Sequence, residues 1–462
     1  MDLIIRNAIV VTMDQERRII KDGAVAISGQ AITRVGKSEE LKGESAEFQV
    51  DGRGRIVMPG LINAHVHLSY SLAKGCGDDL PFTDWLPVVF RLEDGYSDEE
   101  WRLASQLSMA EMIKSGTTCF GDTNVYEQID QIAKSLEESG IRGVLAKKVF
   151  DASPGEIEKV PWYRKEWNAD ALSVDTAVKD YNKWNGRASG RIKIGFGPQA
   201  WPGCSADGYR RVAELSRKMG TVNLVHHTES REWADFVRKN YGKEPTMMLG
   251  DFGILGPNTL LENAPIITDE EISLISRTNT RFNWLTTSNV KNYLDVVDLS
   301  KFLDKGITVS LGTSGGLINN VNDVFREMKT LALQQRQLRK RPDAISPEAV
   351  LEMATIGGAK ALSMEHDVGS LEPGKKADVI VVNTDQPHLT PVVNPVSTLV
   401  YSVNGGDVET SIVDGELVML NRKLLTIDEK ELLEKSSEAS GRILSKTGIK
   451  DLPSARTKWR YS

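Results

Sequence analysis

Residues 59–68, PGLINAHVHL, combine an apolar run with two histidines at its end, His65 and His67. An apolar run of this length is typical of a buried strand. Side chains two apart on a strand point to the same face, so both imidazoles can bind one divalent ion. The loop that follows, LSYSLAKG, is expected at the C-terminal mouth of a parallel barrel, where barrel enzymes hold their active sites.

The segment 58–364 alternates apolar, strand-like runs with amphipathic helical stretches such as DEEWRLASQLSMAEMIKSG. Such alternation predicts a parallel sheet with helical crossovers, and eight strands are the number that a closed (β/α)8 TIM barrel requires. The candidate strands are IVMPGLINAHVH, TTCFGDT, GVLAKKVF, IKIGFGP, TVNLVHHT, NTLLENA, TRFNWLT and ITVSLGTS.

Short β-rich runs with Gly and Asp turns flank this segment on both sides, which predicts strands and tight turns. We therefore expect an α/β chain in which residues 1–57 and 365–425 form one composite β-sandwich domain around the barrel of residues 58–364. The segment 426–462 is predicted to be a C-terminal helix and tail, because IDEKELLEKSSEASGRILSK has an amphipathic pattern.

The composition argues against several classes of partner. The 462 residues carry a formal charge of −7 with acids and bases interspersed, so neither nucleic acid nor an anionic membrane is the expected partner. Three dispersed cysteines indicate neither a disulfide framework nor a cysteine-rich zinc site, and no signal-like or membrane-length apolar run is found. A soluble, cytoplasmic protein with a small, neutral ligand is the expectation.

The string PGLINAHVHL resembles the metal-binding strand of the amidohydrolase superfamily, in its branch of cytosine deaminase-like and triazine chlorohydrolase-like enzymes. The resemblance continues in order through DLPFTDWL, GTTCFGDT, GPQAWPGCS and VGSLEPGKKADVIVV, and so spans nearly the entire chain. It implies a metal-dependent hydrolase with the barrel and the composite β domain described above.

In VNLVHHTES, residues 222–230, His226 and Glu229 match the family's His-x-x-Glu, whose His binds metal and whose Glu exchanges protons. A third imidazole also completes a three-ligand site with an open position for water, the arrangement of catalytic zinc. Glu229 could take a proton from that water and deliver it to the leaving group. His227 faces away by strand alternation and is expected to be structural.

The chain departs from the family at four strand ends. The family string AHCVHLTD reads ENAPIITD, which places Asn263 where a His is usual. The string SHCPxSN becomes NWLTTSN, with Asn283 and Trp284, and the altered GPHA gives Gln199. On strand eight the family's GTD reads GTS, so Ser314 replaces the Asp that binds metal and acts as a base.

Two interpretations of these departures are open. Either the protein has lost its metal or its chemistry and binds a ligand or is only a folded relic, or the three histidines hold the ion while Glu229 alone transfers protons. In the second case Ser314 and Asn263 have weaker coordinating or hydrogen-bonding roles. We favour the second, because a decayed site has no reason to keep His65, His67, His226 and Glu229 together in a chain with only six histidines.

The triazine hydrolase branch includes an enzyme in which a hydroxyl residue replaces that Asp and the His-x-x-Glu carboxylate is the sole proton shuttle. Phenylurea and thiocarbamate (molinate) hydrolases look similar in length and architecture. The resemblance therefore implies cleavage of C–N, C–S or C–halogen bonds in small neutral nitrogen compounds, as in xenobiotic degradation. The alternatives are an aminohydrolase (deaminase) of a nucleobase-like heterocycle and an inactive, ligand-binding homologue.

The expected substrate-binding residues are Asn263, Asn283, Trp284, Gln199 and Trp85, which together make an uncharged pocket suited to a neutral substrate. The expected cofactor is one divalent metal ion. Zinc is the default for three imidazoles, with cobalt, iron or manganese as alternatives. A homo-oligomer, dimer or tetramer, is expected from the family resemblance.

Overall fold

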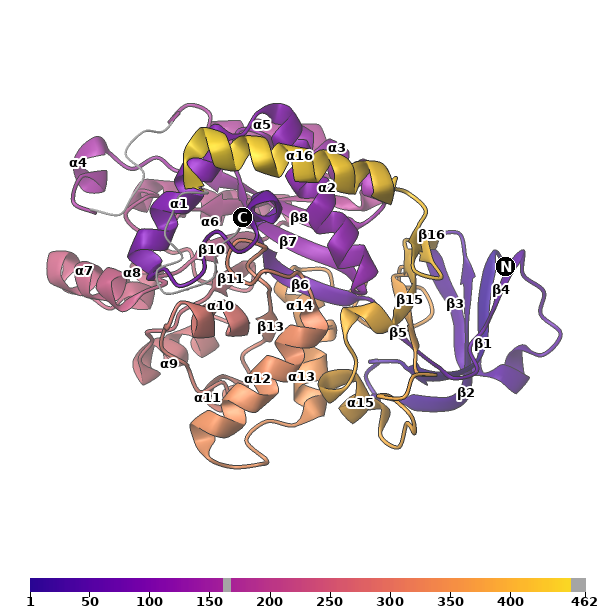
Figure 1. Ribbon diagram of the computed structural model, residues 1–462. Helices are drawn as coiled ribbons and strands as arrows, with labels where there is room; N and C mark the ends of the chain where they lie inside the picture. Colours follow the sequence, from indigo (N-terminus) through magenta and orange to yellow (C-terminus); the bar gives the residue numbers. More distant parts are fainter. Residues whose placement is uncertain (161–167, 450–462) are drawn as a thin grey trace, which may run out of the picture.

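The computed structural model describes residues 1–160 and 168–449, which form a barrel and a smaller sheet domain side by side (Figure 1). Eight parallel strands make the barrel, each paired with the next in chain order, and they correspond to the eight predicted strands. They are β6 Leu61–Val66, β7 Thr117–Val125, β8 Arg142–Val149, β9 Ile192–Pro198, β10 Asn223–His226, β11 Thr259–Glu262, β12 Arg281–Trp284 and β13 Val309–Leu311.

The barrel is nearly closed by contacts between its first and last strands. The backbone N–H groups of Thr313 and Ser314 donate to the carbonyl of His65, at 3.1 and 3.0 Å, and the N–H of His67 donates to the carbonyl of Ser314 at 2.9 Å. The end of strand eight is therefore fixed directly to the residues that carry the two histidines.

Helices cover the outside of the barrel, as the alternating pattern predicts (Figure 1). Local signals set their ends: α2 begins with a capping box between Ser97 and Glu100, and α6 ends at Gly220 in the left-handed conformation. The α-helices are α1 Phe82–Gly95, α2 Asp98–Lys114, α3 Ile129–Ser139, α4 Pro154–Ile157, α5 Val174–Trp184, α6 Ala206–Met219, α7 Arg231–Tyr241, α8 Pro245–Asp251, α9 Asp269–Arg277, α10 Thr286–Lys291, α11 Ser300–Leu303, α12 Val324–Arg339, α13 Pro347–Met353, α14 Ile356–Ala361, α15 Pro395–Tyr401 and α16 Glu429–Thr447. The 3-10 helices are η1 Ser38–Leu41, η2 Leu68–Ala73, η3 Ala188–Gly190 and η4 Gly405–Asp407.

A β-bulge on β6 sets the direction of its histidines. Between Asn63 and Val66 this strand has one more residue than the facing part of β7. Ala64 belongs to the apolar core inside the barrel, so simple alternation would send His65 outward. The extra residue shifts the alternation, and His65 and His67 both face the interior.

The second domain is one mixed sheet of nine strands, built from both ends of the chain. The antiparallel pairing of β5 with β14 joins the two halves, and Ile5, Val25, Val381 and Ile412 share one core between them. This confirms the predicted composite β domain. Its strands are β1 Leu3–Val11, β2 Ile19–Ser28, β3 Ala31–Lys37, β4 Phe48–Asp51, β5 Arg55–Pro59, β14 Val379–Asn383, β15 Val408–Val413, β16 Glu416–Leu420 and β17 Lys423–Leu424.

The predicted C-terminal helix is α16, which lies across α2 on the outside of the barrel (Figure 1). The Ser440 hydroxyl donates to the carbonyl of Leu72 in η2, and the Lys446 ammonium donates to the carbonyl of Gly95 at the end of α1. The basic tail of the sequence lies outside the described residues. The exact domain boundaries given above stay a prediction.

Within residues 1–160 and 168–449, no helix is both long and apolar enough to cross a lipid bilayer. The three cysteines, Cys76, Cys119 and Cys204, are free thiols.

Candidate metal centre and active site

Three imidazoles converge at the C-terminal mouth of the barrel. His65 and His67 come from the end of β6, and His226 is the last residue of β10. All three side chains are buried, and each offers one nitrogen within 4.8 Å of the others. In the described part of the chain this is the one cluster of His, Cys, Asp and Glu with such convergence.

The cluster fits a single divalent ion. The Nε2 atoms of His65 and His67 are 3.2 Å apart. Two ligands at about 2.0–2.1 Å from a tetrahedral ion lie about 3.3–3.4 Å apart, so these nitrogens can share one ion with little movement.

Burial also keeps imidazoles in the form that binds metal. It lowers the pKa of His67 and of His226 well below the ordinary value of 6.5, and the neighbouring imidazoles and the Lys148 ammonium act in the same direction. Neutral imidazole is the metal ligand, so these two side chains are ready to bind at neutral pH. The three histidines can therefore hold one divalent metal ion, and zinc suits this set of side chains best.

Glu229 lies beside the cluster, on the short loop between β10 and α7, and lines the same pocket. Burial raises the pKa of its carboxyl from 4.5 to about 7, because the charged form is poorly solvated there. A carboxyl with a pKa near neutrality can both accept and donate a proton at physiological pH, as a proton shuttle must.

A pocket lies above the metal centre, with His67, His226 and Glu229 in its lining. Six aromatic residues line it: Tyr70, Phe82, Trp85, Phe90, Tyr126 and Trp233. Its amide and hydroxyl groups come from Gln199, Asn263, Ser288, Asn289, Asn292 and Ser314.

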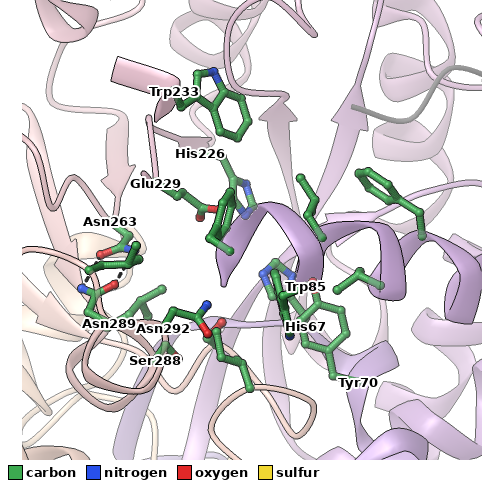
Figure 2. A pocket seen from close by; sticks show the side chains of 18 of the residues that line it. His67, Tyr70, Trp85, His226, Glu229, Trp233, Asn263, Ser288, Asn289 and Asn292 are labelled. Carbon is green, nitrogen blue, oxygen red and sulfur yellow. Dashed lines mark hydrogen bonds between the residues drawn. The ribbon is translucent and has the colours of Figure 1, made fainter. Parts of the chain in front are cut away.

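The two kinds of side chain are separated in space (Figure 2). The amides of Asn263 and Asn289 lie on one side of the pocket and Tyr70 on the other, with Glu229 and His226 between them. Trp85 packs edge-on against Tyr70, with ring centroids 5.8 Å apart, so the aromatic wall is held rigidly.

The structure brings three of the five predicted substrate-binding residues to the pocket. Gln199, Trp85 and Asn263 line it. The Gln199 Oε1 and the Trp85 Nε1 are buried without a protein partner in the described residues, so both are available to a ligand.

Asn283 and Trp284 do not line the pocket, contrary to expectation. The Trp284 ring is fully buried outside the barrel strands, 6.3 Å from the Phe282 ring, and its Nε1 donates to Gln334 on α12. The Asn283 amide oxygen accepts from the Ser310 hydroxyl on the neighbouring strand β13. Strand alternation on β12 explains both positions, since the two residues occupy opposite faces below the mouth.

Ser314 lines the pocket just after β13, with its backbone in the left-handed region at φ 62°. The hydrogen bonds between its backbone and β6 place it next to His65 and His67. Its role as a weak metal ligand stays a prediction. His227 faces away from the site, with Nε2 2.9 Å from the Thr246 hydroxyl, as predicted.

One carboxylate at the site was missed by the sequence analysis. Glu262, the last residue of β11, is fully buried with Oε1 3.2 Å from His65 Nδ1 and Oε2 3.6 Å from His226 Nδ1. Its position at the end of the apolar run TLLE, and so at the mouth of the barrel, could have identified it. The sequence analysis singled out the next residue instead, because Asn263 stands where the family has a His. Lys148 on β8 is also fully buried, and burial lowers the pKa of its ammonium to about 8.

A family comparison matches residues 56–418 to the amidohydrolase family. The chain is 37% identical over 446 residues to a 5'-deoxyadenosine deaminase of Methanosarcina acetivorans, covering 96% of this chain and 99% of that one. It is 34% identical over 435 residues to a 5-methylthioadenosine/S-adenosylhomocysteine deaminase of Thermoanaerobacter pseudethanolicus, covering 94% and 97% of the two chains.

Solved structures share the fold over almost the whole length. A zinc-bound adenosine deaminase of Xanthomonas campestris superposes with a TM-score of 0.89 at 24% identity, covering 96% of this chain and 99% of the other. A zinc complex of atrazine chlorohydrolase from Arthrobacter aurescens superposes with a TM-score of 0.86 at 22% identity, covering 95% and 100%. At these identities the structural likeness establishes the architecture only.

Proposed function

Because the chain belongs to the amidohydrolase family, a family of hydrolytic enzymes, we propose that it is a metal-dependent aminohydrolase that deaminates an adenosine-type nucleoside. The observation that carries the proposal is the position of Glu229, a buried carboxyl beside three converging imidazoles at the floor of an aromatic pocket.

The sequence relatives support deamination over the activity that the sequence analysis favoured. That analysis placed the triazine, phenylurea and thiocarbamate hydrolases first and a heterocycle deaminase second. The relatives described above are named as deaminases of adenosine derivatives and match nearly the whole chain at 34–37% identity. We therefore put the deaminase first.

In deamination, water adds to the ring carbon that bears the amino group, and ammonia then leaves as a carbonyl forms. A divalent ion held by the three histidines supplies Lewis-acid chemistry that brings the pKa of water toward neutrality. Glu229 would accept the first proton from the attacking water and pass it to the adjacent ring nitrogen. It would then accept the second proton from the hydroxyl of the adduct and donate it to the amino group, which leaves as ammonia while the carbonyl forms. Each donation returns Glu229 to its carboxylate form.

The pocket suits a purine ring. Tyr70, Trp85 and Trp233 offer flat apolar surfaces against which an aromatic base can pack. Asn292 and Ser288, on the opposite side, can hydrogen-bond to ring nitrogens or ribose hydroxyls without introducing charge. A neutral nucleoside is therefore compatible with both walls.

A second candidate is a hydrolase of triazines, phenylureas or thiocarbamates. One observation favours it: the pocket position after β13 carries the hydroxyl of Ser314 rather than a carboxylate. Without that carboxylate only Glu229 is left to move protons at the pocket surface. Such a site serves any substrate whose leaving group needs a single proton.

The test is an activity panel on the full-length chain loaded with zinc. Ammonia release and the change in ultraviolet absorbance are measured with adenosine, 5'-deoxyadenosine, 5'-methylthioadenosine and S-adenosylhomocysteine, alongside a triazine, a phenylurea and a thiocarbamate. Turnover of a nucleoside with stoichiometric ammonia supports the proposal. Turnover of only the second group would transfer the assignment to the second candidate, and turnover of neither group would contradict both.

A further inference from the structure

Glu262 is a buried carboxylate that faces two of the three metal-binding imidazoles. Its Oε1 is 3.2 Å from Nδ1 of His65, and its Oε2 is 3.6 Å from Nδ1 of His226. Neither oxygen has a well-aligned hydrogen bond to any residue that the structure describes, and the side chain is fully buried. Burying a carboxylate costs free energy, because the charge loses its water, unless a partner in the protein compensates for that loss.

The geometry shows which side of His65 faces the ion. The Nε2 atoms of His65 and His67 are 3.2 Å apart, close to the spacing of about 3.3–3.4 Å between two ligands of one tetrahedral ion. His65 therefore binds through Nε2, and its Nδ1 carries the proton. That nitrogen lies 3.2 Å from Glu262 Oε1, which is within hydrogen-bond distance.

The charge of the site points to the same residue. Three neutral imidazoles and the Ser314 hydroxyl offer no negative charge to a divalent ion, because the strand-eight Asp expected from the family resemblance is absent. Glu262 lies on β11, two strands before β13 in the barrel order. It reaches the cluster from below, since it does not belong to the pocket lining.

We propose that Glu262 is the positioning carboxylate of the metal centre. It holds His65 through Nδ1, and its charge also acts on His226, whose Nδ1 is 3.6 Å from the second oxygen. From β11, the sixth barrel strand, it supplies the negative charge that the end of β13, the eighth, lacks. Carboxylate–histidine–metal contacts of this kind fix the tautomer and the orientation of the ring and raise the basicity of the ligand. The proposal rests on the metal-dependent function given above, but it does not depend on which substrate is used.

The experiment compares the zinc affinity of the wild type and of Glu262→Gln in the full-length protein, by competition with a chromophoric chelator and without substrate. Gln keeps the volume but removes the charge, and we expect zinc binding weakened about 10- to 100-fold. The visible spectrum of the Co²⁺-loaded protein should change as well, because the ligand field of the two imidazoles changes.

Glu327→Gln is the matched control. Glu327 on α12 is also a fully buried carboxylate, and it accepts from the Asn319 amide and the Thr287 N–H rather than facing the imidazoles. We expect it to leave zinc affinity and the Co²⁺ spectrum unchanged. Equal effects of the two substitutions, or no effect of Glu262→Gln, would overturn the proposal.

A measurement on the wild type covers the case in which Glu262→Gln does not fold. In the zinc-loaded protein with ¹⁵N-labelled histidine, the ring nitrogens of only six histidines must be assigned. Binding of His65 through Nε2, with a protonated Nδ1, supports the proposal, and binding through Nδ1 overturns it. A wild type that binds zinc but deaminates nothing would contradict the proposed function alone, whereas a wild type that binds no zinc would contradict both.

Discussion

The side-chain amides of Asn263 and Asn289 are joined by two reciprocal hydrogen bonds. Asn263 Nδ2 donates to Asn289 Oδ1 at 2.9 Å, and Asn289 Nδ2 donates to Asn263 Oδ1 at 2.7 Å (Figure 2). The pair connects the end of β11 with α10, and both residues are buried and line the pocket. Asn263 is thus held in one orientation by a protein partner before any substrate binds.

We expect the two amides to be energetically coupled. Replacing either residue by Ala leaves one buried amide without its partner, which costs about 1–3 kcal/mol of unfolding free energy. The double variant should cost less than the sum of the single variants, by about 1–2 kcal/mol. Chemical denaturation of Asn263→Ala, Asn289→Ala and the double variant measures this coupling. Additive losses would show that the pair does not act as a unit.

The proton shuttle gives the second prediction. Glu229→Gln keeps the shape of the side chain but can no longer take a proton from water, so kcat should fall by about 10²- to 10⁴-fold. Zinc content should stay at the wild-type level, because Glu229 is not one of the three converging imidazole ligands. Steady-state kinetics and elemental analysis of the same preparation test both parts.

An exposed carboxylate is the control for this variant. Glu270 on α9 is exposed and does not line the pocket, so Glu270→Gln should have wild-type kcat. A Glu229→Gln protein with near-normal turnover would remove Glu229 from the mechanism. A loss of both zinc and activity would show that Glu229 is needed for metal binding, so the loss of activity could not be assigned to proton transfer.

The raised pKa of Glu229 also predicts how the stability of the metal-free protein depends on pH. Its pKa is about 7 in the folded chain against an ordinary value of 4.5, so the folded state binds more protons than the unfolded state between these values. The contribution of Glu229 to stability is therefore greatest below pH 4.5 and is lost as the pH rises through 7, by about 3 kcal/mol.

The comparison that tests this is between wild type and Glu229→Gln, both stripped of metal. Since Gln does not titrate, the variant should become progressively more stable than the wild type from about pH 5 to pH 8, as measured by urea denaturation. A difference that is constant over this pH range would show that Glu229 is solvated or paired in the folded protein.

Much of the fold and the convergence of the three histidines could be predicted from the sequence, because both depend on local patterns. Each barrel strand is an apolar run between turn signals, and His65, His67 and His226 fall at the ends of two such runs. A histidine at the end of a barrel strand is at the active-site mouth whatever the details of packing. Glu229 could be predicted because it lies three residues after His226, which matches the family's His-x-x-Glu.

The rest depended on contacts between distant segments or on the phase of a strand. Glu262 meets His65 only because β11 and β6 belong to the same barrel, which no local pattern reports. Trp284 was expected at the mouth, but it follows Asn283 directly, and adjacent residues on a strand without a bulge face opposite sides. The bulge on β6 could not be predicted either, because the apolar pattern of that strand does not show where its extra residue lies.

A buried ion pair links the barrel to the sheet domain. Arg142, the first residue of β8, donates from Nε and Nη2 to the two carboxylate oxygens of Asp378, both at 2.9 Å, and from Nη2 to Asp414 at 3.1 Å. Asp378 directly precedes β14, and Asp414 directly follows β15. All three side chains are at most 1% exposed, so water cannot compensate for the loss of a partner.

Arg142→Met should therefore cost about 3–5 kcal/mol of unfolding free energy, because it leaves the buried Asp378 carboxylate without its cation and Asp414 with only Lys376, 3.3 Å away. The control is Arg102→Met, which breaks the Arg102–Glu138 pair at 2.7 Å, where both side chains are 46% exposed. An exposed pair contributes about 0–1 kcal/mol, so this variant should unfold at nearly the wild-type denaturant concentration. Equal midpoints for the two variants would show that the Arg142 cluster does not hold the two domains together.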